Sequence, residues 1–146
     1  MTFDLKSSLG YQLSLAARRA ERGFEGALAG HELTRLGWCV LLAAGQEGLS
    51  RPSDIADWIG VDRAAISRLL TVLEDQGRIT READEEDARV RGVVLTRSGR
   101  DVLKAGIVAA EENVARVYGG LAAEDRAQLH RILGIINATG DAPDRI

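Results

Sequence analysis

The sequence predicts a mainly α-helical protein with one small β-hairpin. Over most of the chain, apolar residues recur at spacings of three and four, which is the pattern of an amphipathic helix. Between residues 79 and 95 the pattern changes to two short runs that read as strands, separated by a polar segment. The 146 residues contain no Pro/Ser-rich linker and no repeat, so we expect a single domain over 1–146.

Two helices are expected in the N-terminal third. The first runs from about 3 to 29 and carries an apolar stripe that includes Leu9, Phe24 and Leu28. The second covers 33–44 and is apolar nearly all round, so we expect it to be buried on more than one side.

Two shorter helices, 52–59 and 63–76, are predicted next. Gly60 suits the left-handed position that ends a helix, and Asp62 has the chemistry to cap the helix that follows. Gly77 would end that second helix. Two short helices joined by a tight turn form a helix-turn-helix.

The second helix of this pair has two unlike faces. Ile66, Leu70 and Leu73 form an apolar face that would enter a core. The opposite face carries small, polar and basic residues, namely Arg63, Ala64, Ser67, Arg68 and Thr71. Since the strands 79–82 and 91–95 follow at once, the module from about 33 to 96 is expected to be a winged helix, a fold that reads DNA.

Long helices are also predicted after this module, and they indicate how the protein assembles. The terminal helices, about 3–29 and 97–139, are longer than a winged helix of this size needs. They are amphipathic but have little to cover within one small domain. We therefore expect a homodimer in which the terminal helices of two protomers interleave. The alternative is a monomer that folds them over its own core.

Composition excludes several classes of protein. Lys and Arg number 19 against 22 Asp and Glu, a net charge of −3, which argues against coating nucleic acid or anionic membrane without specificity. The uncharged run Leu36–Gln46 is too short to span a bilayer, which takes roughly 20 residues, and the N-terminus has no secretory-signal pattern. The single cysteine, Cys39, excludes an intrachain disulfide and is consistent with a cytoplasmic protein.

The sequence carries no motif for catalysis, a cofactor or a metal. It has no nucleophile motif, no phosphate-binding glycine loop and no paired His/carboxylate signature. His31, His130 and Cys39 lack the close spacing of a zinc site. We therefore expect neither an enzyme nor a cofactor.

Several segments together resemble one known family. Residues 84–89 read D-E-E-D-A-R and residues 93–99 read V-V-L-T-R-S-G. They resemble the wing signature of the MarR (multiple antibiotic resistance regulator) family, which is D-x-R-D-x-R, a short apolar strand, then L-T-x-x-G. The other segments that look like the family are Leu33–Thr34, Trp38–Leu41, Pro52–Ala56, Leu73–Ile79 and Leu121–Asp125. The resemblance covers nearly the whole chain in the family's order.

The resemblance implies a homodimeric winged-helix transcriptional regulator that binds a pseudo-palindromic, double-stranded DNA operator. Members are commonly repressors that a small phenolic or other aromatic effector, or oxidation, releases from DNA. One position departs from the signature: Glu86 stands where the family usually has Arg, so that four acids, 84–87, lie at the wing tip. Either Arg89 and Arg91 alone carry the wing contact, or the wing binds weakly.

The helix that begins after Asp62 would enter the major groove. Arg63 and Arg68 would reach guanine edges or phosphates, and Ser67 and Thr71 would reach bases or backbone. The alternative for this set is a solvated helix face.

Two further groups would contact the DNA outside that groove. Ser50, Arg51 and Ser53, at the start of the preceding helix, suit phosphate contacts through hydroxyls and backbone amides. Arg89 matches the family's wing arginine, which inserts into the minor groove, and Asp87 would orient its guanidinium. The alternative is a structural Asp87–Arg89 pair that never touches DNA.

The family's effector pockets lie between the dimer helices and the reading module, beside the second helix. His31, Arg35, Trp38 and Cys39 are therefore candidates to line such a pocket. Three of them have a structural alternative: Trp38 as a core aromatic, His31 as a capping or surface residue, and Cys39 as a packed hydrophobe and not a redox sensor.

A winged helix used only to bind protein is the alternative function, and the acidic wing tip would suit it. The salt dependence of DNA binding separates the two functions, because a protein that does not contact phosphates gives a slope near zero.

Overall fold

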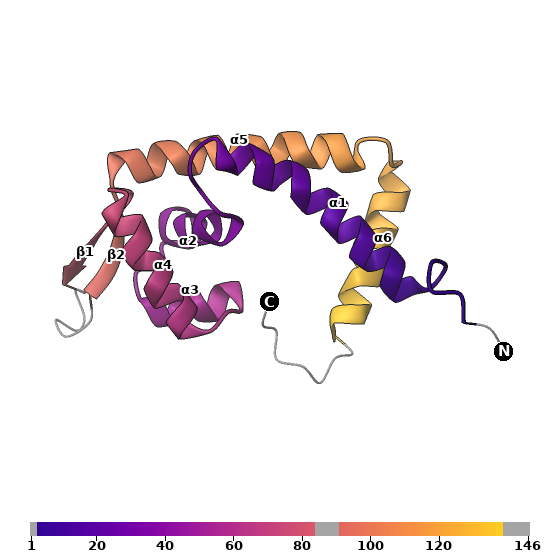
Figure 1. The fold of residues 1–146 in the computed structure, drawn as a ribbon, viewed down its shortest axis with the longest axis horizontal. Coiled ribbons are helices and arrows are strands. Elements are labelled where there is room, and N and C mark those ends of the chain that lie inside the picture. The colour runs from indigo at the N-terminus through magenta and orange to yellow at the C-terminus, as the bar shows by residue number, and fades with distance from the viewer. Residues whose placement is uncertain (1–2, 84–90, 139–146) are drawn as a thin grey trace.

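Figure 1 shows the computed structural model, which describes residues 3–83 and 91–138. Within these residues it confirms the predicted fold class, with six helices and one two-stranded antiparallel hairpin. The elements are α1 (Leu9–Ala29), α2 (Arg35–Gly45), α3 (Pro52–Ile59), α4 (Arg63–Asp75), β1 (Ile79–Ala83), β2 (Arg91–Leu95), α5 (Arg97–Tyr118) and α6 (Ala123–Ala138). None of the helices in the described part of the chain has both the length and the hydropathy that crossing a membrane requires.

Local capping groups define the helix pair α3–α4. Gly60 ends α3 with φ 80°, in the left-handed region that favours glycine. The Asp62 Oδ1 atom accepts hydrogen bonds from the backbone amides of Ala64 (2.8 Å) and Ala65 (3.1 Å), two of the N–H groups that the start of α4 leaves unpaired. Gly77 follows α4 with φ 67°. The predicted cap and both predicted helix ends are therefore confirmed.

Two helix starts differ from the sequence expectation. The first helix begins after Ser8 and not at residue 3, because the Ser8 hydroxyl accepts a hydrogen bond from the Tyr11 amide (3.4 Å) and caps the helix there. The second begins after Thr34 and not at residue 33, because Thr34 Oγ1 accepts from the Gly37 amide (3.0 Å). In both cases a hydroxyl side chain that caps a helix lies inside a run of otherwise helical pattern.

The hairpin is anchored to the helix-turn-helix. Ile79 of β1 lies opposite Leu95 of β2, and Arg81 lies opposite Val93. The side chains of Ile79, Val93 and Leu95 are buried in the core. The Val93 amide also donates to the carbonyl of Ser50 (2.8 Å), which ties the hairpin to the segment just before α3.

The core lies in residues 33–96, which we call the head, and continues into the adjoining parts of α1 and α5. α2 runs through its centre and contacts α1, α3, α4, α5 and β2. Burial on more than one side, expected from the apolar pattern of this helix, is therefore confirmed. The largest fully buried side chains are Leu28, Val40, Leu41, Ile55, Ile66, Leu70, Leu73 and Ile79.

A compact joint connects the hairpin, α4 and α5. Thr96 caps α5, because its Oγ1 accepts from the Gly99 amide (3.0 Å). The same hydroxyl donates to the Gly77 carbonyl (2.7 Å), and the Thr96 amide donates to the Arg78 carbonyl (3.0 Å). One threonine thereby fixes the start of α5 against the end of α4.

The outer helices extend well beyond the head. In Figure 1, α5 runs along one edge of the molecule with the head below its first half, and α6 leads away from its other end. α1 lies against α5, where Asn113 Nδ2 donates to the Ala20 carbonyl (2.9 Å). The apolar stripe of α1 is buried only toward its end: Leu28 is 0% exposed but Leu9 is 82% exposed. No residue of α6 within Ala123–Ala138 is buried.

Candidate nucleic-acid interface and ligand pocket

The outer face of α4 presents Arg63, Ser67 and Arg68 to solvent. Arg63 Nη2 lies 3.4 Å from Asp57 Oδ2, and the two side chains are 70% and 65% exposed. An exposed ion pair of this kind contributes about 0–1 kcal/mol, so Arg63 is able to leave Asp57 for a phosphate or a base at little cost. The face predicted from the sequence is therefore outward and accessible within this chain.

Thr71, the last of the five residues predicted on this face, also forms hydrogen bonds within the protein. Its hydroxyl donates to the Ser67 carbonyl (3.3 Å) and accepts a hydrogen bond from Arg81 Nη2 (3.3 Å). Thr71 is thus a link between α4 and β1 as well as a member of the exposed face.

Arg81 and Glu74 form a contact that the sequence did not reveal. Arg81 Nε of β1 lies 3.2 Å from Glu74 Oε2 of α4, an ion pair in which Nε makes no aligned hydrogen bond. The Arg81 side chain is 23% exposed. The two residues are seven apart in sequence, and no local pattern pairs them, because the contact forms only when the hairpin folds back against α4.

Ser50, Arg51 and Ser53, which were predicted to contact phosphates, lie at the start of α3 and are half-buried. Ser53 Oγ donates to Asp54 Oδ1 (3.1 Å). The carbonyl of Ser50 accepts the hydrogen bond from Val93 of β2, and Arg51 occupies the N-cap position of α3 without a side-chain capping bond. Ser50 and Arg51 each have further interactions within the protein.

In the described part of the wing, Arg91 is exposed at the start of β2. Its Nη2 donates to the carbonyl of Arg81 across the hairpin (2.9 Å). Asp87 and Arg89, for which a minor-groove contact was predicted, lie outside the described residues.

A cavity of about 280 Å³ lies between α1, α2 and the end of α3. Three of the four residues predicted to line an effector pocket, Arg35, Trp38 and Cys39, contribute to it. The remaining lining side chains are apolar, namely Phe24, Leu36, Ile59 and Val61. The rings of Trp38 and Phe24 meet edge to face, with centroids 5.0 Å apart and an interplanar angle of 83°. The cavity is therefore apolar and aromatic, with one cationic group.

That cationic group is held from α1. Arg35 Nη1 forms an ion pair with Glu21 Oε1, and both side chains are partly exposed. The pair joins α1 to α2 beside the cavity, so an anionic ligand would compete with Glu21 for Arg35.

Burial raises the pKa of the Cys39 thiol above its usual value of 9.0, although the nearby Arg35 charge lowers that pKa in part. The thiol is half-buried and protonated at neutral pH. A redox sensor needs an accessible thiol of lowered pKa, so Cys39 has the chemistry of a pocket-wall residue.

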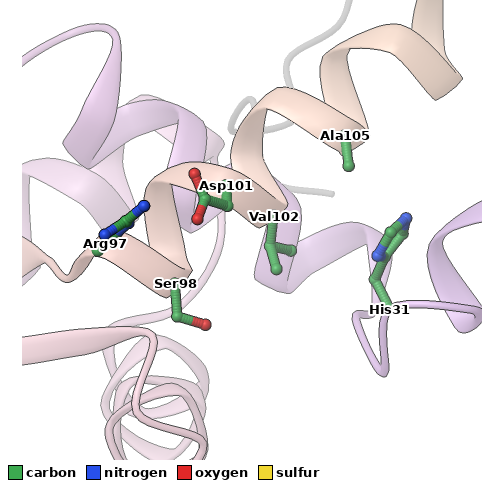
Figure 2. Close-up of a pocket in the computed structure, with 6 residues that line it drawn as sticks. All are labelled: His31, Arg97, Ser98, Asp101, Val102 and Ala105. Carbon is green, nitrogen blue, oxygen red and sulfur yellow. The ribbon is translucent and has the colours of Figure 1, made fainter.

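His31 lines a different pocket from the other three residues. It lies in the turn between α1 and α2 and faces the first turns of α5, as Figure 2 shows. That open pocket has a volume of about 400 Å³ and is lined by His31, Arg97, Ser98, Asp101, Val102 and Ala105. His31 therefore lies at another pocket than Arg35, Trp38 and Cys39, and the effector role of all four residues stays a prediction. The His31 carbonyl accepts a hydrogen bond from buried Arg78, and that bond ties the turn to the segment between α4 and β1.

The described residues contain no group of three or more His, Cys, Asp or Glu side chains arranged to hold a metal ion. The described residues therefore offer an outward face of α4 with two arginines and, between α1, α2 and the end of α3, a small apolar cavity.

Comparison with protein families supports the sequence resemblance. The MarR family model matches residues 33–90, which cover most of the head. Among curated proteins, the chain is 30% identical over 129 residues to the HTH-type transcriptional regulator TtmR of Methylorubrum extorquens. The match covers 88% of this chain and 66% of TtmR, so the chain spans about two thirds of that relative's length.

Solved structures show the same fold over nearly the whole chain. A probable transcriptional regulator from Pseudomonas aeruginosa has a TM-score of 0.79 and 27% identity, covering 91% of this chain and 99% of that one. Bordetella bronchiseptica BpsR, whose DNA binding is regulated by 6-hydroxynicotinic acid, has a TM-score of 0.83 at 22% identity, with 97% and 99% covered. A mutant of Escherichia coli MarR in complex with operator DNA has a TM-score of 0.81 at 21% identity, with 92% and 99% covered. Family model, curated relative and fold agree with the wing and helix motifs: this chain belongs to the MarR family of winged-helix regulators.

Proposed function

We propose that this protein is a homodimeric transcriptional regulator that binds a specific double-stranded DNA operator and acts as a repressor. The observation that carries the proposal is the outer face of α4, where Arg63, Ser67 and Arg68 are exposed on a helix whose opposite face is locked into the core. A helix presented in this way enters the major groove in winged helices. The similarity in fold to the E. coli MarR mutant in complex with operator DNA supports this role.

The homodimer is supported by the apolar surface that the outer helices expose. Leu9 and Leu13 of α1 and Ile132 and Ile135 of α6 are 82%, 41%, 40% and 51% exposed. Apolar side chains gathered on terminal helices are typical of surfaces buried by a second subunit. A second copy of the chain would also supply the second reading helix that a pseudo-palindromic operator requires.

The cavity between α1 and α2 is proposed as the effector site. Its aromatic walls, Phe24 and Trp38, suit a small aromatic molecule, and Arg35 suits an acidic group on that molecule. The regulation of BpsR by 6-hydroxynicotinic acid supports an aromatic acid as the effector class. Because the cavity is formed by α1 and the head together, a bound ligand would bias how these two parts sit relative to each other.

DNA binding is tested with Arg68→Ala and Arg63→Ala. An operator duplex is first obtained by selection from a random pool, and affinity is then measured by fluorescence anisotropy at several salt concentrations. Each variant is expected to lose about 1–3 kcal/mol of operator binding, and a lost phosphate contact lowers the salt slope by about one.

Arg22→Ala is the matched control, because Arg22 is an exposed arginine of α1 outside the head. It should bind the operator like the wild type. If the wild type itself binds with a salt slope near zero, the protein-binding function is favoured and the proposed function is wrong.

A further inference from the structure

Arg81 is a partly buried cation that pairs with the side of the reading helix. It lies in the middle of β1, opposite Val93 of β2, and its side chain is 23% exposed. An arginine that only attracts DNA phosphates would lie in solvent, as Arg63 and Arg68 do. The burial of Arg81 indicates a role inside the protein.

The guanidinium of Arg81 holds two consecutive turns of α4. Its Nε pairs with Glu74 Oε2 at 3.2 Å, and its Nη2 donates to Thr71 Oγ1 at 3.3 Å. Thr71 and Glu74 are three residues apart on α4 and so lie on one face of the helix. A planar guanidinium that donates one hydrogen bond to a helix and forms an ion pair with it one turn further on restrains the rotation of that helix as well as its distance.

The backbone of Arg81 is held from the other side. Arg91 Nη2 of β2 donates to the Arg81 carbonyl at 2.9 Å. A continuous set of contacts therefore runs from β2 through Arg81 to the C-terminal half of α4. It joins α4, which the proposed function places in the major groove, to the hairpin, whose wing the family resemblance implies at the minor groove.

We propose that Arg81 is a positioning residue, which through Glu74 and Thr71 fixes the angle between the reading helix α4 and the wing. This proposal rests on the proposed DNA-binding function. With the angle preset, α4 and the wing engage the major and minor grooves together, and less free energy is lost in ordering them on binding. Since Glu74 neutralises the Arg81 charge, Arg81 contributes to operator preference and little to attraction toward DNA in general.

Glu74→Gln tests the proposal, because electrostatics and positioning predict opposite results. The substitution removes a negative charge close to the DNA face, so attraction alone predicts tighter binding to every duplex. Positioning predicts that operator binding becomes about tenfold weaker, while binding to random duplex and the salt slope stay as in the wild type. Glu82→Gln, on the neighbouring position of β1, is the control that removes the same charge without touching α4.

Arg81→Gln should weaken operator binding to the same degree as Glu74→Gln, and the double variant should be no weaker than either single one. Arg81→Lys, which keeps the charge but loses the fork, should give an intermediate loss. Thermal unfolding of each variant, together with the affinity for random duplex, separates loss of positioning from loss of the folded protein.

Three results overturn the role of Arg81. One is unchanged or tighter operator binding by Glu74→Gln. The second is an Arg81→Gln variant that loses operator and random duplex equally with a salt slope lowered by about one, which identifies a direct phosphate contact. The third is additive losses in the double variant. If the wild type shows no operator preference at all, the proposed function fails, and the role of Arg81 fails with it.

Discussion

Cys39 illustrates how a single residue's surroundings decide its chemistry. Its thiol lies on the wall of the apolar cavity, and burial raises its pKa despite the charge of Arg35. From the sequence, a packed cysteine was favoured over a sensor only because Cys39 has no cluster of basic groups and no second cysteine near it. The structure supplies the physical reason, which is desolvation of the thiolate.

The raised pKa predicts the pH dependence of Cys39 alkylation. Below the raised pKa the folded protein keeps the unreactive thiol, so iodoacetamide should react slowly at pH 7–8 and faster only above the usual value of 9.0. The same protein unfolded in urea is the control and should react faster at pH 8. Rates are read by intact-mass spectrometry. Rapid alkylation of the folded protein that titrates near pH 7 would contradict this assignment.

Single residues of the reading face divide into those the sequence identifies and those it does not. Arg63 and Arg68 follow from helical periodicity, which needs only the chain itself. The pairing of Glu74 with Arg81 could not be predicted from periodicity, because it depends on how the hairpin packs against α4. The pocket of His31 could not be predicted for the same reason, since the direction of the turn before α2 is set by a tertiary contact with Arg78.

At the scale of elements, the joint between the hairpin, α4 and α5 explains the L-T-x-x-G segment physically. Thr96 bonds to the carbonyls of Gly77 and Arg78 and caps α5. Gly99 lies against the backbone of Arg78, where an added Cβ would come within 2.0 Å of the Arg78 carbonyl oxygen. Thr96 is required for its bonds to the backbone at the end of α4, and Gly99 because the backbone of α5 approaches that of Arg78 too closely for a side chain.

Gly99→Ala should therefore destabilise the protein by about 1–3 kcal/mol, since a backbone atom has to move to admit the methyl group. Urea unfolding followed by circular dichroism measures the change. Gly26→Ala in the last turn of α1 is the matched control, because nothing lies within 4 Å of its added Cβ. This control should be neutral or stabilising by up to about 1 kcal/mol through helix propensity. Equal stability of Gly99→Ala and the wild type would refute the close contact.

Element boundaries were predictable where local chemistry sets them. The sequence identifies the residues that cap or end helices, namely Asp62, Thr96, Gly60 and Gly77. The start of α1 was not predicted correctly, because Phe3 and Leu5 continue the apolar pattern although the helix begins only after Ser8. These two side chains are 81% and 58% exposed, so the pattern there does not correspond to a core within this chain.

At the scale of the whole molecule, the core of one chain buries only part of the apolar side chains, and others on the outer helices stay exposed. The head is closed around buried α2, whereas α6 within Ala123–Ala138 buries no residue. Because a helix of this length gains most of its stability from packing, α6 needs a partner that the described residues, 3–83 and 91–138, do not provide. The proposed homodimer supplies one.

Sedimentation at micromolar concentration should therefore give a species of about 31 kDa, twice the 15.7 kDa of one chain. Ile135→Glu should shift the protein toward the monomer, because it places a charge among the exposed apolar residues of α6. Asn137→Glu adds the same charge at a polar position of the helix and should leave the dimer intact. A wild-type species of 15.7 kDa would contradict the dimer.

The net charge of −3 is a property of the whole chain, and it determines how strongly the protein attracts DNA of any sequence. A protein of this charge is poorly suited to hold DNA of any sequence, so recognition has to come from a few well-placed arginines and from the geometry that holds them. The chain therefore should bind random duplex weakly and its operator with a clear preference.

Selection of bound sequences from a random pool of duplexes tests this central claim most directly. The enriched DNA is predicted to contain two inverted half-sites whose centres lie about 10 base pairs apart, one helical turn, as two α4 helices of a dimer require. Enrichment should be lost with Arg68→Ala and kept with Arg22→Ala. If repeated rounds with the wild type enrich no common sequence, or enrich a single half-site without a symmetric partner, the protein is not the dimeric operator-binding regulator proposed here.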